Sequence, residues 1–355
     1  MDFRFTEDQL DFQASLRKAL EKECTAEQIR ALWRTETGRS RERWAKLAEL
    51  GLLGLLVPEP YGGLGMGEVD LVLLLEETGR AALPEPVLET AAVGVPLLAG
   101  LSTTKLTEHW LPKVANGKAI LTVGHPLNPF VTDAHVADLL LLPHGNELHA
   151  VPRERVALQH EPCSDPSRRL FRVDWTPSAE TRVAQREEAQ HLLDAALDRA
   201  ALTCAAQLLG IGQQMLDMGV RYATEREQFG KPIGSFQAVK HLLANVAVRI
   251  EFARPVVYRA AFSVARDSAA RAVDLSHAKV AAAEAAALAA KTVHQVHGAI
   301  GYTWECDLHI WMKRAWALDV AWGTGAWHRA RVAAAVLDGA APAASFGYSA
   351  PSASL

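Results

Sequence analysis

The stretch YATEREQFGKPIGSFQAVKH, residues 222–241, decides the fold and places a candidate binding site where two helices meet. Arg226 offers a rigid fork of donors that suits a pyrophosphate, whereas Phe229 and Phe236 offer flat apolar faces on which rings can stack. These residues alone describe a site for an anion beside an aromatic ring. The alternative is a helix-turn-helix corner in which Arg226 pairs with a neighbouring glutamate.

Three motifs in order along the chain carry a resemblance to a known family. The run from Arg226 to Gly230, followed by Ile233, Phe236 and His241, is similar to the signature of the acyl-CoA dehydrogenase family. Residues 49–86 resemble the helical first domain of that family, and residues 293–315 (VHQVHGAIGYTWECDLHIWMKRA) resemble its late helix pair. Three ordered motifs are far more specific than one.

Composition limits the domain number, the partners and the location that we expect for this chain. The chain has 355 residues, 49% of them apolar, which predicts two or three domains with an ample core. A net charge of -4 gives no basic field, so nucleic acid is not an expected partner. The four cysteines show no metal-ligand spacing, so we expect no metal site and a reducing, cytoplasmic location. The longest apolar run, residues 50–58, falls far short of the roughly 20 residues that span a bilayer, so no membrane association is expected.

The pattern along the chain predicts a mainly α fold with a small β domain. Thr6 and Gln9 predict a capping box at the start of an N-terminal helical domain, residues 1–117. Short apolar runs separated by turn residues predict strands over 118–184, and long helical patterns return over 185–338. The resemblance implies that these are a reduced middle β-barrel and a C-terminal four-helix bundle. Pro255 predicts a bend inside the bundle, and an Ala/Ser/Pro-rich tail, 339–355, is expected to be disordered.

The β domain departs from the family pattern. In the family, a Thr/Ser/Gly loop of this domain holds the flavin pyrophosphate and ribityl chain, and a Trp-containing strand lies against the isoalloxazine. The equivalent stretch here, VGHPLNPFVTDAHVADLLLL (123–142), has neither feature. The resemblance therefore implies that this chain does not hold FAD on its own β domain.

The catalytic carboxylate of the family is also missing. The reaction removes an α-proton with a buried glutamate while the β-hydrogen leaves as hydride to the flavin. Counting from the late motif places the usual base position at Trp322, and a minority position on an earlier helix falls at Ala200. Neither an indole nor a methyl group accepts a proton. Asp319, one turn before Trp322, is a weak candidate for a displaced base, although a solvated surface Asp is the simpler interpretation.

The chain retains the residues that, in the family, contact the flavin bound to a neighbouring subunit. In the family, the motif Arg reaches the neighbour's pyrophosphate, the Phe packs on the neighbour's flavin or adenine, and the late Gln and Gly approach the adenosine. The sequence departs at Ala299, where a second Gly is usual. The expected cofactor-binding residues are Arg226, Gln228, Phe229, Ile233, Phe236, Gln295 and Gly298.

The resemblance thus implies one subunit of a heteromeric, FAD-dependent acyl-CoA dehydrogenase of the steroid side-chain type. A homologous subunit is expected to carry the Glu, with FAD shared at the interface, acyl-CoA as substrate and an electron-transfer flavoprotein as electron acceptor. Two alternatives stay open. One is a self-sufficient homomeric dehydrogenase with a displaced carboxylate such as Asp319, and the other is a flavin-free scaffold subunit.

Overall fold

The first part of the chain is helical. A computed structural model describes residues 4–102 and 104–339. The N-terminal helices are α1 (Glu7–Glu23), α2 (Ala26–Trp33), α3 (Arg41–Glu49), the 3₁₀ turn η1 (Glu59–Tyr61), α4 (Glu68–Arg80), the π-helical η2 (Leu88–Gly94), α5 (Val95–Ala99) and α6 (Thr104–Ala115). The expected capping box is confirmed, because the Thr6 backbone N donates to Gln9 Oε1 at 2.8 Å and the Gln9 backbone N donates to Thr6 Oγ1 at 3.3 Å. These reciprocal bonds satisfy donors that the first turn of α1 leaves free.

The middle part holds two small sheets. Its strands are β1 (Leu121–Val123), β2 (Val131–Thr132), β3 (Leu139–His144), β4 (Glu147–Pro152), β5 (Ala157–Glu161), β6 (Leu170–Asp174) and β7 (Arg182–Gln185), with the 3₁₀ turn η3 (Arg153–Arg155) after β4. One sheet has the order β1-β3-β4-β7, in which β1 runs parallel to β3, and the other has the order β2-β6-β5. A separate small apolar cluster, which includes Leu140, Val151 and Phe171, lies in this part.

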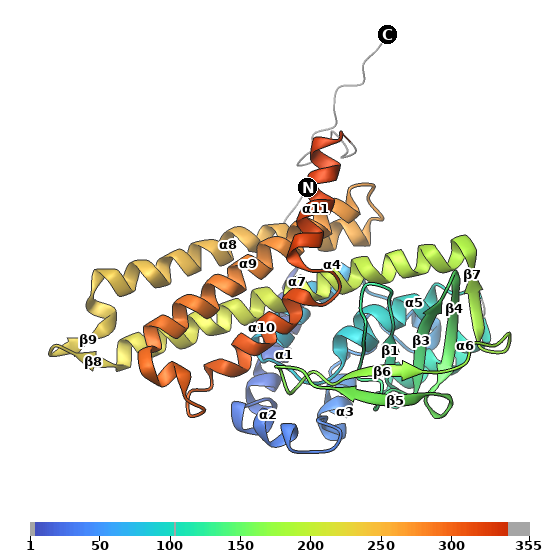
Figure 1. Cartoon of the computed structure of the whole chain (residues 1–355), viewed down its shortest axis with the longest axis horizontal. Helices are drawn as coiled ribbons and strands as arrows, with labels where there is room; N and C mark the ends of the chain where they lie inside the picture. The colour runs from blue at the N-terminus through green and yellow to red at the C-terminus, as the bar shows by residue number, and fades with distance from the viewer. Residues whose placement is uncertain (1–3, 103, 340–355) are drawn as a thin grey trace, which may run out of the picture.

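Long helices form the last part. They are α7 (Arg186–Glu225), α8 (Gln237–Ala265), α9 (Arg271–His297), α10 (Leu308–Val320) and α11 (Gly325–Leu337), with the hairpin β8 (Glu227–Gln228) and β9 (Lys231–Pro232) and the 3₁₀ turns η4 (Ile233–Ser235) and η5 (Gly298–Tyr302) between them. Figure 1 shows α7, α8 and α9 side by side, the β8–β9 hairpin at one end, and the β sheets beside the other end of α7. The expected bend does not interrupt α8, which continues through Pro255. Pro255 is exposed, so the missing N–H lies at the solvent side of the helix.

Two glycines let the N-terminal part contact the bundle closely. A Cβ added at Gly210 of α7 would lie 1.9 Å from the carbonyl oxygen of Glu76, and one at Gly79 of α4 would lie 2.1 Å from that of Gln207. The backbones of α4 and α7 therefore touch where they cross. One apolar cluster runs continuously through the helical part and the bundle, so the two share a core.

These observations confirm a mainly α fold with a small β part. The division at 1–117, 118–184 and 185–338 remains a proposal, because the first and third segments share a core. Of the tail expected at 339–355, residues 340–355 lie outside the described residues. Within 4–102 and 104–339, none of the helices combines the length and apolar character that a bilayer crossing requires.

Candidate functional site

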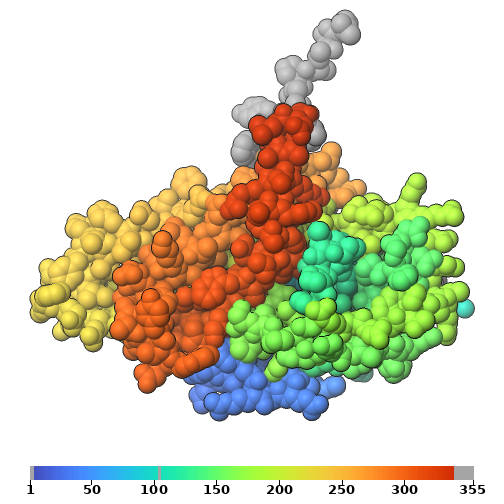
Figure 2. Space-filling model, in the orientation of Figure 1, coloured from blue at the N-terminus to red at the C-terminus, as the bar shows by residue number. Residues whose placement is uncertain are grey.

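The hairpin that follows α7 presents an aromatic side chain to solvent. Phe229 and Gly230 connect β8 to β9, and their φ angles of 55° and 74° are both positive. Positive φ at both residues of a two-residue hairpin loop is typical of a type I′ turn, which Asn and Gly usually form. A phenylalanine is strained in this conformation, and its ring gains nothing from burial because Phe229 is 92% exposed. In Figure 2 the hairpin (yellow) lies at the extreme left of the molecule.

Arg226 is fixed through its main chain while its side chain is free. Its N–H donates to the carbonyl of Tyr222 at 2.9 Å, and its carbonyl accepts from the N–H of Ile233 at 2.8 Å. The guanidinium is exposed and has no hydrogen bond or ion pair with any residue that the structure describes. The pairing with a neighbouring glutamate, which was the alternative interpretation, is therefore not formed within the described chain.

The other residues of the hairpin region lie closer to the bundle than Phe229 or are held by local contacts. The Phe236 ring is half-buried and edge-on to Phe229 with the centroids 6.1 Å apart, and Lys231 Nζ lies 4.5 Å from the Phe236 centroid. Ile233 is half-buried and packs against the main core. Gln228 is exposed, and its Nε2 donates to the carbonyl of Glu227 at 2.7 Å. One end of the hairpin is thus anchored in the core while its tip stays in solvent.

The late motif reaches the same end of the bundle. Tyr222, one turn before Arg226, stacks on His297 of α9 with ring centroids 4.3 Å apart. Gln295 and Gly298, on either side of His297, are exposed. His297 Nδ1 is 2.8 Å from the carbonyl of Val293, and burial lowers the pKa of this imidazole. A neutral imidazole stacks well on a tyrosine ring. This contact therefore fixes the position of the late motif relative to the stretch 222–241.

The two positions where a base is expected are both buried and apolar. Trp322 is 2% exposed, and its backbone has a φ of 56°. Its N–H donates to Asn128 Oδ1 at 3.0 Å, and its ring lies 5.6 Å from that of His125. Ala200 lies fully buried on α7. Asp319 is half-buried near the end of α10.

A buried lysine, which the sequence interpretation missed, holds the turn of Trp322. Lys279 of α9 is fully buried, and its Nζ donates to the carbonyls of Leu318, Asp319, Ala321 and Gly323 at 2.8, 3.1, 2.9 and 3.3 Å. Burial lowers the pKa of this amine. His328 Nε2 lies 3.0 Å from the carbonyl of Trp322. The signal in the sequence was Lys279, one of two lysines in an alanine-rich run, AKVAAAEAAALAAKTV (278–293).

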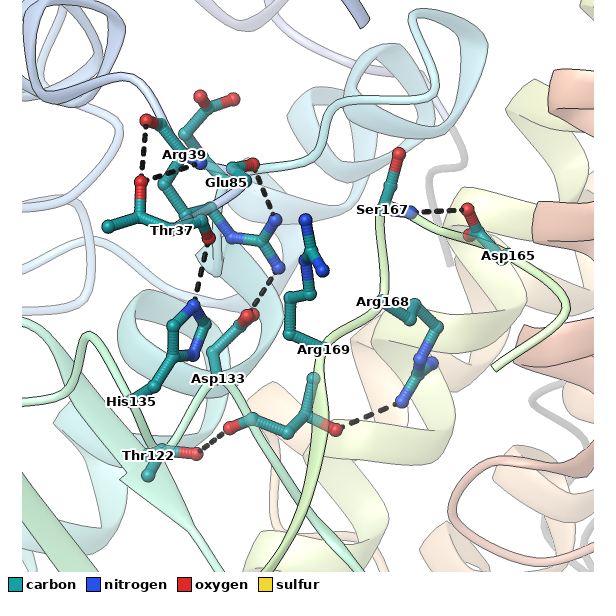
Figure 3. A network of polar contacts seen from close by, with 12 residues as sticks. Thr37, Arg39, Glu85, Thr122, Asp133, His135, Asp165, Ser167, Arg168 and Arg169 are labelled. Carbon is teal, nitrogen blue, oxygen red and sulfur yellow. Dashed lines mark hydrogen bonds and ion pairs between the residues drawn. The ribbon is translucent and has the colours of Figure 1, made fainter. Parts of the chain in front are cut away.

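A buried polar network joins the three parts of the chain (Figure 3). Arg39, from the loop before α3, forms an ion pair with Asp133, which follows β2. Arg168 Nη2 donates to Thr132 Oγ1 at 3.1 Å. Arg314 of α10 pairs with Asp165 and donates from Nη1 to the carbonyl of Leu83 at 2.8 Å. The network fixes the β part against both helical parts.

Two carboxyls and a small cavity lie in this network. Burial raises the pKa of Glu89, and the Asp133 carboxylate raises it further. Burial also raises the pKa of Asp133, although the Arg39 and Arg168 guanidinium groups oppose that shift. The cavity that Glu89 and Asp133 line measures about 30 Å³, room for about one or two waters, so it is no acyl pocket.

The donor set at the hairpin suits part of a flavin dinucleotide. A free guanidinium and an exposed ring are the groups that a diphosphate and a planar ring require. By contrast, Thr132 and Asp133 of the β part are already engaged within the network. The described part of the chain gathers no group of three or more His, Cys, Asp or Glu side chains able to hold a metal ion.

Comparison with known proteins gives family matches over most of the chain. The profile of the acyl-CoA dehydrogenase N-terminal domain matches residues 6–118, and that of the acyl-CoA dehydrogenase C-terminal domain matches residues 191–337. The acyl-CoA dehydrogenase IpdE2 of Mycolicibacterium smegmatis is 35% identical over 298 residues, which cover 83% of this chain and 88% of that protein.

Solved structures show the same architecture. The ChsE4-ChsE5 complex of Mycobacterium tuberculosis contains a chain that superposes with a TM-score of 0.85 at 27% identity, covering 95% of this chain and 99% of that chain. A variant of the Tcur3481-Tcur3483 steroid ACAD superposes with a TM-score of 0.84 at 26% identity, covering 94% and 99%.

Proposed function

The chain belongs to the acyl-CoA dehydrogenase family, whose members are oxidoreductases of acyl-CoA thioesters, and from this premise we propose that it is a base-lacking subunit of a heteromeric enzyme. In this assignment it completes an FAD site on a homologous partner. The partner supplies the catalytic glutamate and most of the acyl pocket. Two of the similar structures, the ChsE4-ChsE5 complex and the Tcur3481-Tcur3483 steroid ACAD, carry the names of two different chains, which supports a heteromer.

The observation that carries the proposal is the hairpin tip. Phe229 is 92% exposed in a strained backbone conformation, and Arg226 beside it carries an unpaired charge among the described residues. Strain of this kind persists where function requires it. An exposed phenylalanine beside a free guanidinium stabilises this chain very little, so both groups are better explained as contacts to something that docks on this end of the bundle.

Each residue has one task in the shared site. Arg226 would hold the pyrophosphate of FAD with paired N–H donors, and Phe229 with Phe236 behind it would cover a ring face and exclude water. Gln228 and Ile233 would support the hairpin, and Gln295 and Gly298 would receive the adenosine end. When bound, FAD supplies the hydride acceptor for the β-hydrogen. Proton removal falls to the partner, because the positions of Trp322 and Ala200 hold no proton acceptor.

The relatives support the substrate. One similar structure is a steroid ACAD, and the relative IpdE2 is an acyl-CoA dehydrogenase, so we assign a CoA thioester of a bulky, steroid-like side chain as the substrate. An electron-transfer flavoprotein is the electron acceptor that the family resemblance implies.

The decisive experiment compares the chain alone with a co-expressed pair that includes a homologous, glutamate-carrying subunit. The lone chain is expected to be colourless and the pair yellow, with one FAD for each pair of chains by absorbance. Arg226→Ala in the pair should lower FAD retention at least tenfold, because a charge-assisted diphosphate contact is lost. The control is Arg155→Ala, which removes an exposed arginine whose Nη1 contacts Glu180 at 2.9 Å in the β part.

The outcomes separate the alternatives. A pair that keeps its FAD after Arg226→Ala contradicts the shared-site assignment, and a pair that never binds FAD favours the flavin-free scaffold. A lone chain that is yellow and dehydrogenates an acyl-CoA establishes the homomeric enzyme.

One observation favours that homomeric enzyme. Glu89 is a buried carboxyl with a raised pKa, and it lies on the π-helical η2, a conformation frequent at functional sites. Because its cavity measures only about 30 Å³, this role also requires the cavity to open and admit the acyl chain. If Glu89 is the base, Glu89→Gln abolishes turnover by the lone chain while Asp319→Asn does not. If Asp319 is the base instead, Asp319→Asn abolishes turnover by the lone chain and Glu89→Gln does not.

A further inference from the structure

We propose that His297 is a positioning residue through which the heteromer selects the dinucleotide FAD over the mononucleotide FMN. The inference rests on the proposed function, because it concerns the same shared site. In that site Arg226 is assigned to the pyrophosphate, and Gln295 and Gly298 are assigned to the adenosine end. FMN has no adenosine, so only a dinucleotide depends on how these two groups of residues are spaced.

The end of α9 leaves its main chain open at the position assigned to the adenosine. Gly298 caps this helix with a φ of 63° and a ψ of -139°, a combination that favours glycine. A Cβ added there would meet no described atom within 4 Å. Gln295, one turn earlier, is exposed. A ligand can therefore approach the backbone of Gly298 and the side chain of Gln295 together.

His297 lies where α7, α9 and η5 meet. Its imidazole stacks on the Tyr222 ring of α7, with the ring centroids 4.3 Å apart and the ring planes 17° from parallel. Its Nδ1 donates to the carbonyl of Val293 at 2.8 Å, because a carbonyl oxygen can only accept. A Cβ added at Gly301 of η5 would lie 3.3 Å from His297 Cβ, so η5 also packs closely on this residue. His297 is thus fixed from three elements.

Two contacts connect the pyrophosphate residue to the adenosine residues. The Arg226 N–H donates to the carbonyl of Tyr222 at 2.9 Å, and the Tyr222 ring stacks on His297, which directly precedes Gly298 in the chain. In Figure 1 the C-terminal ends of α7 and α9 lie beside the β8–β9 hairpin. The stack therefore sets the spacing between the two assigned positions. Binding sites tolerate displacements of only about 0.5 Å, so loss of the stack should weaken a ligand that spans both positions.

The test measures the Kd of FAD and of FMN for the co-expressed pair, after removal of its flavin, by equilibrium dialysis. His297→Leu removes the flat ring, and it should weaken FAD about tenfold while changing FMN by less than about twofold. His297→Phe provides a ring that can stack on Tyr222, so it should keep most of the affinity for FAD. The control is His149→Leu, which removes a buried imidazole whose ring lies 5.0 Å from that of Trp175 in the β part. It should leave the ratio of the two Kd values unchanged.

Tyr222→Leu removes the other ring of the stack from a half-buried position, which covers the case in which His297→Leu does not fold. It should give the same selective loss of FAD. Equal weakening of FAD and FMN, or an unchanged preference for FAD in the leucine variants, would overturn the proposal. Arg226→Ala separates the two levels: a pair that keeps FAD in this variant refutes the shared site itself. Loss of FAD in Arg226→Ala, with an unchanged preference in the leucine variants, refutes only the role of His297.

Discussion

Phe229 is the residue at which stability and binding are expected to oppose each other. Its positive φ costs a side chain other than Gly or Asn about 1 kcal/mol. Phe229→Asn should therefore raise the free energy of unfolding of the lone chain by about 0.5–1 kcal/mol, since Asn adopts this backbone readily. The same change should weaken FAD retention in the pair, because the ring is lost. Denaturant unfolding and visible absorbance measure the two effects.

Phe229→Ala is the matched control, because it removes the ring and keeps a strained Cβ. It should weaken FAD retention as much as Phe229→Asn but give no gain in stability. Equal stabilisation by both variants would mean that exposure of the ring, and not backbone strain, is what costs free energy at this turn.

Buried imidazoles give the chain a defined acid sensitivity. Burial lowers the pKa of His328 to about 4, against an ordinary value of 6.5. Because the folded state binds this proton less readily than the unfolded state, the stability that the neutral ring contributes is complete above pH 6.5 and falls as the pH drops towards 4. A pKa difference of this size between the folded and unfolded states corresponds to about 3 kcal/mol of stability. Solvent screening reduces this contribution to about 2 kcal/mol.

His135 adds to this sensitivity, since burial lowers its pKa to about 4 as well. Urea unfolding at pH 7 and pH 4.5 should therefore show a loss of stability that His328→Gln reduces by up to about 2 kcal/mol. An unchanged pH dependence in His328→Gln would show that the imidazole titrates normally in the folded chain.

At the scale of elements, the crossing of α4 and α7 depends on a missing side chain. A Cβ at Gly210 would lie 1.9 Å from the carbonyl oxygen of Glu76, so Gly210→Ala must push the two helices apart. We expect a loss of about 3 kcal/mol or more in the free energy of unfolding. Differential scanning calorimetry of the lone chain measures it.

Gly212 supplies a control two residues along the same helix. A Cβ there would meet its nearest neighbour at 3.6 Å, an ordinary contact. Gly212→Ala should be neutral or stabilising by up to about 1 kcal/mol, because alanine favours helix. Similar destabilisation by both variants would contradict the close-approach explanation.

Local elements could be predicted from the sequence, whereas contacts between residues far apart in the sequence could not. The capping box at Thr6 and Gln9 involves residues in one turn, so its pattern is visible in the chain. Asp133 and Arg39 pair across 94 positions, and no periodicity links them. Lys279 was missed because a lysine in an alanine-rich run usually indicates a solvated face, and only the crossing of α9 with the end of α10 gives it four carbonyl partners.

The sequence predicted which motifs form the candidate site, but not how their side chains are exposed or packed. Arg226 and Phe229 were proposed because of a resemblance, and their exposure is a property of the hairpin that no spacing reveals. The stack of Tyr222 on His297, which joins the two motifs, depends on how α7 packs on α9. Sequence counting placed Trp322 at the base position, but its burial follows from the whole core.

At the scale of the molecule, α8 carries apolar side chains that the rest of residues 4–102 and 104–339 leaves exposed. Phe252 is 74% exposed, Val248 55% and Leu242 40%. Exposed apolar groups gathered on one element indicate an association surface. Phe252→Glu should therefore shift the co-expressed complex towards smaller species in analytical ultracentrifugation. His277→Glu, at an exposed position of α9, should leave the sedimentation unchanged, and an intact complex in both variants would place the interface elsewhere.

The internal anchoring of the Trp322 turn has a consequence for how such a chain can evolve. Exchanging the indole for a glutamate would strand a carboxylate in a space that is 2% exposed and leave a void the size of two fused rings. Lys279 would meanwhile keep the surrounding main chain from adjusting, since it holds four carbonyls at once. In the proposed heteromer, a glutamate at this one position would therefore not restore catalysis by the chain alone, because the neighbouring side chains would have to change with it.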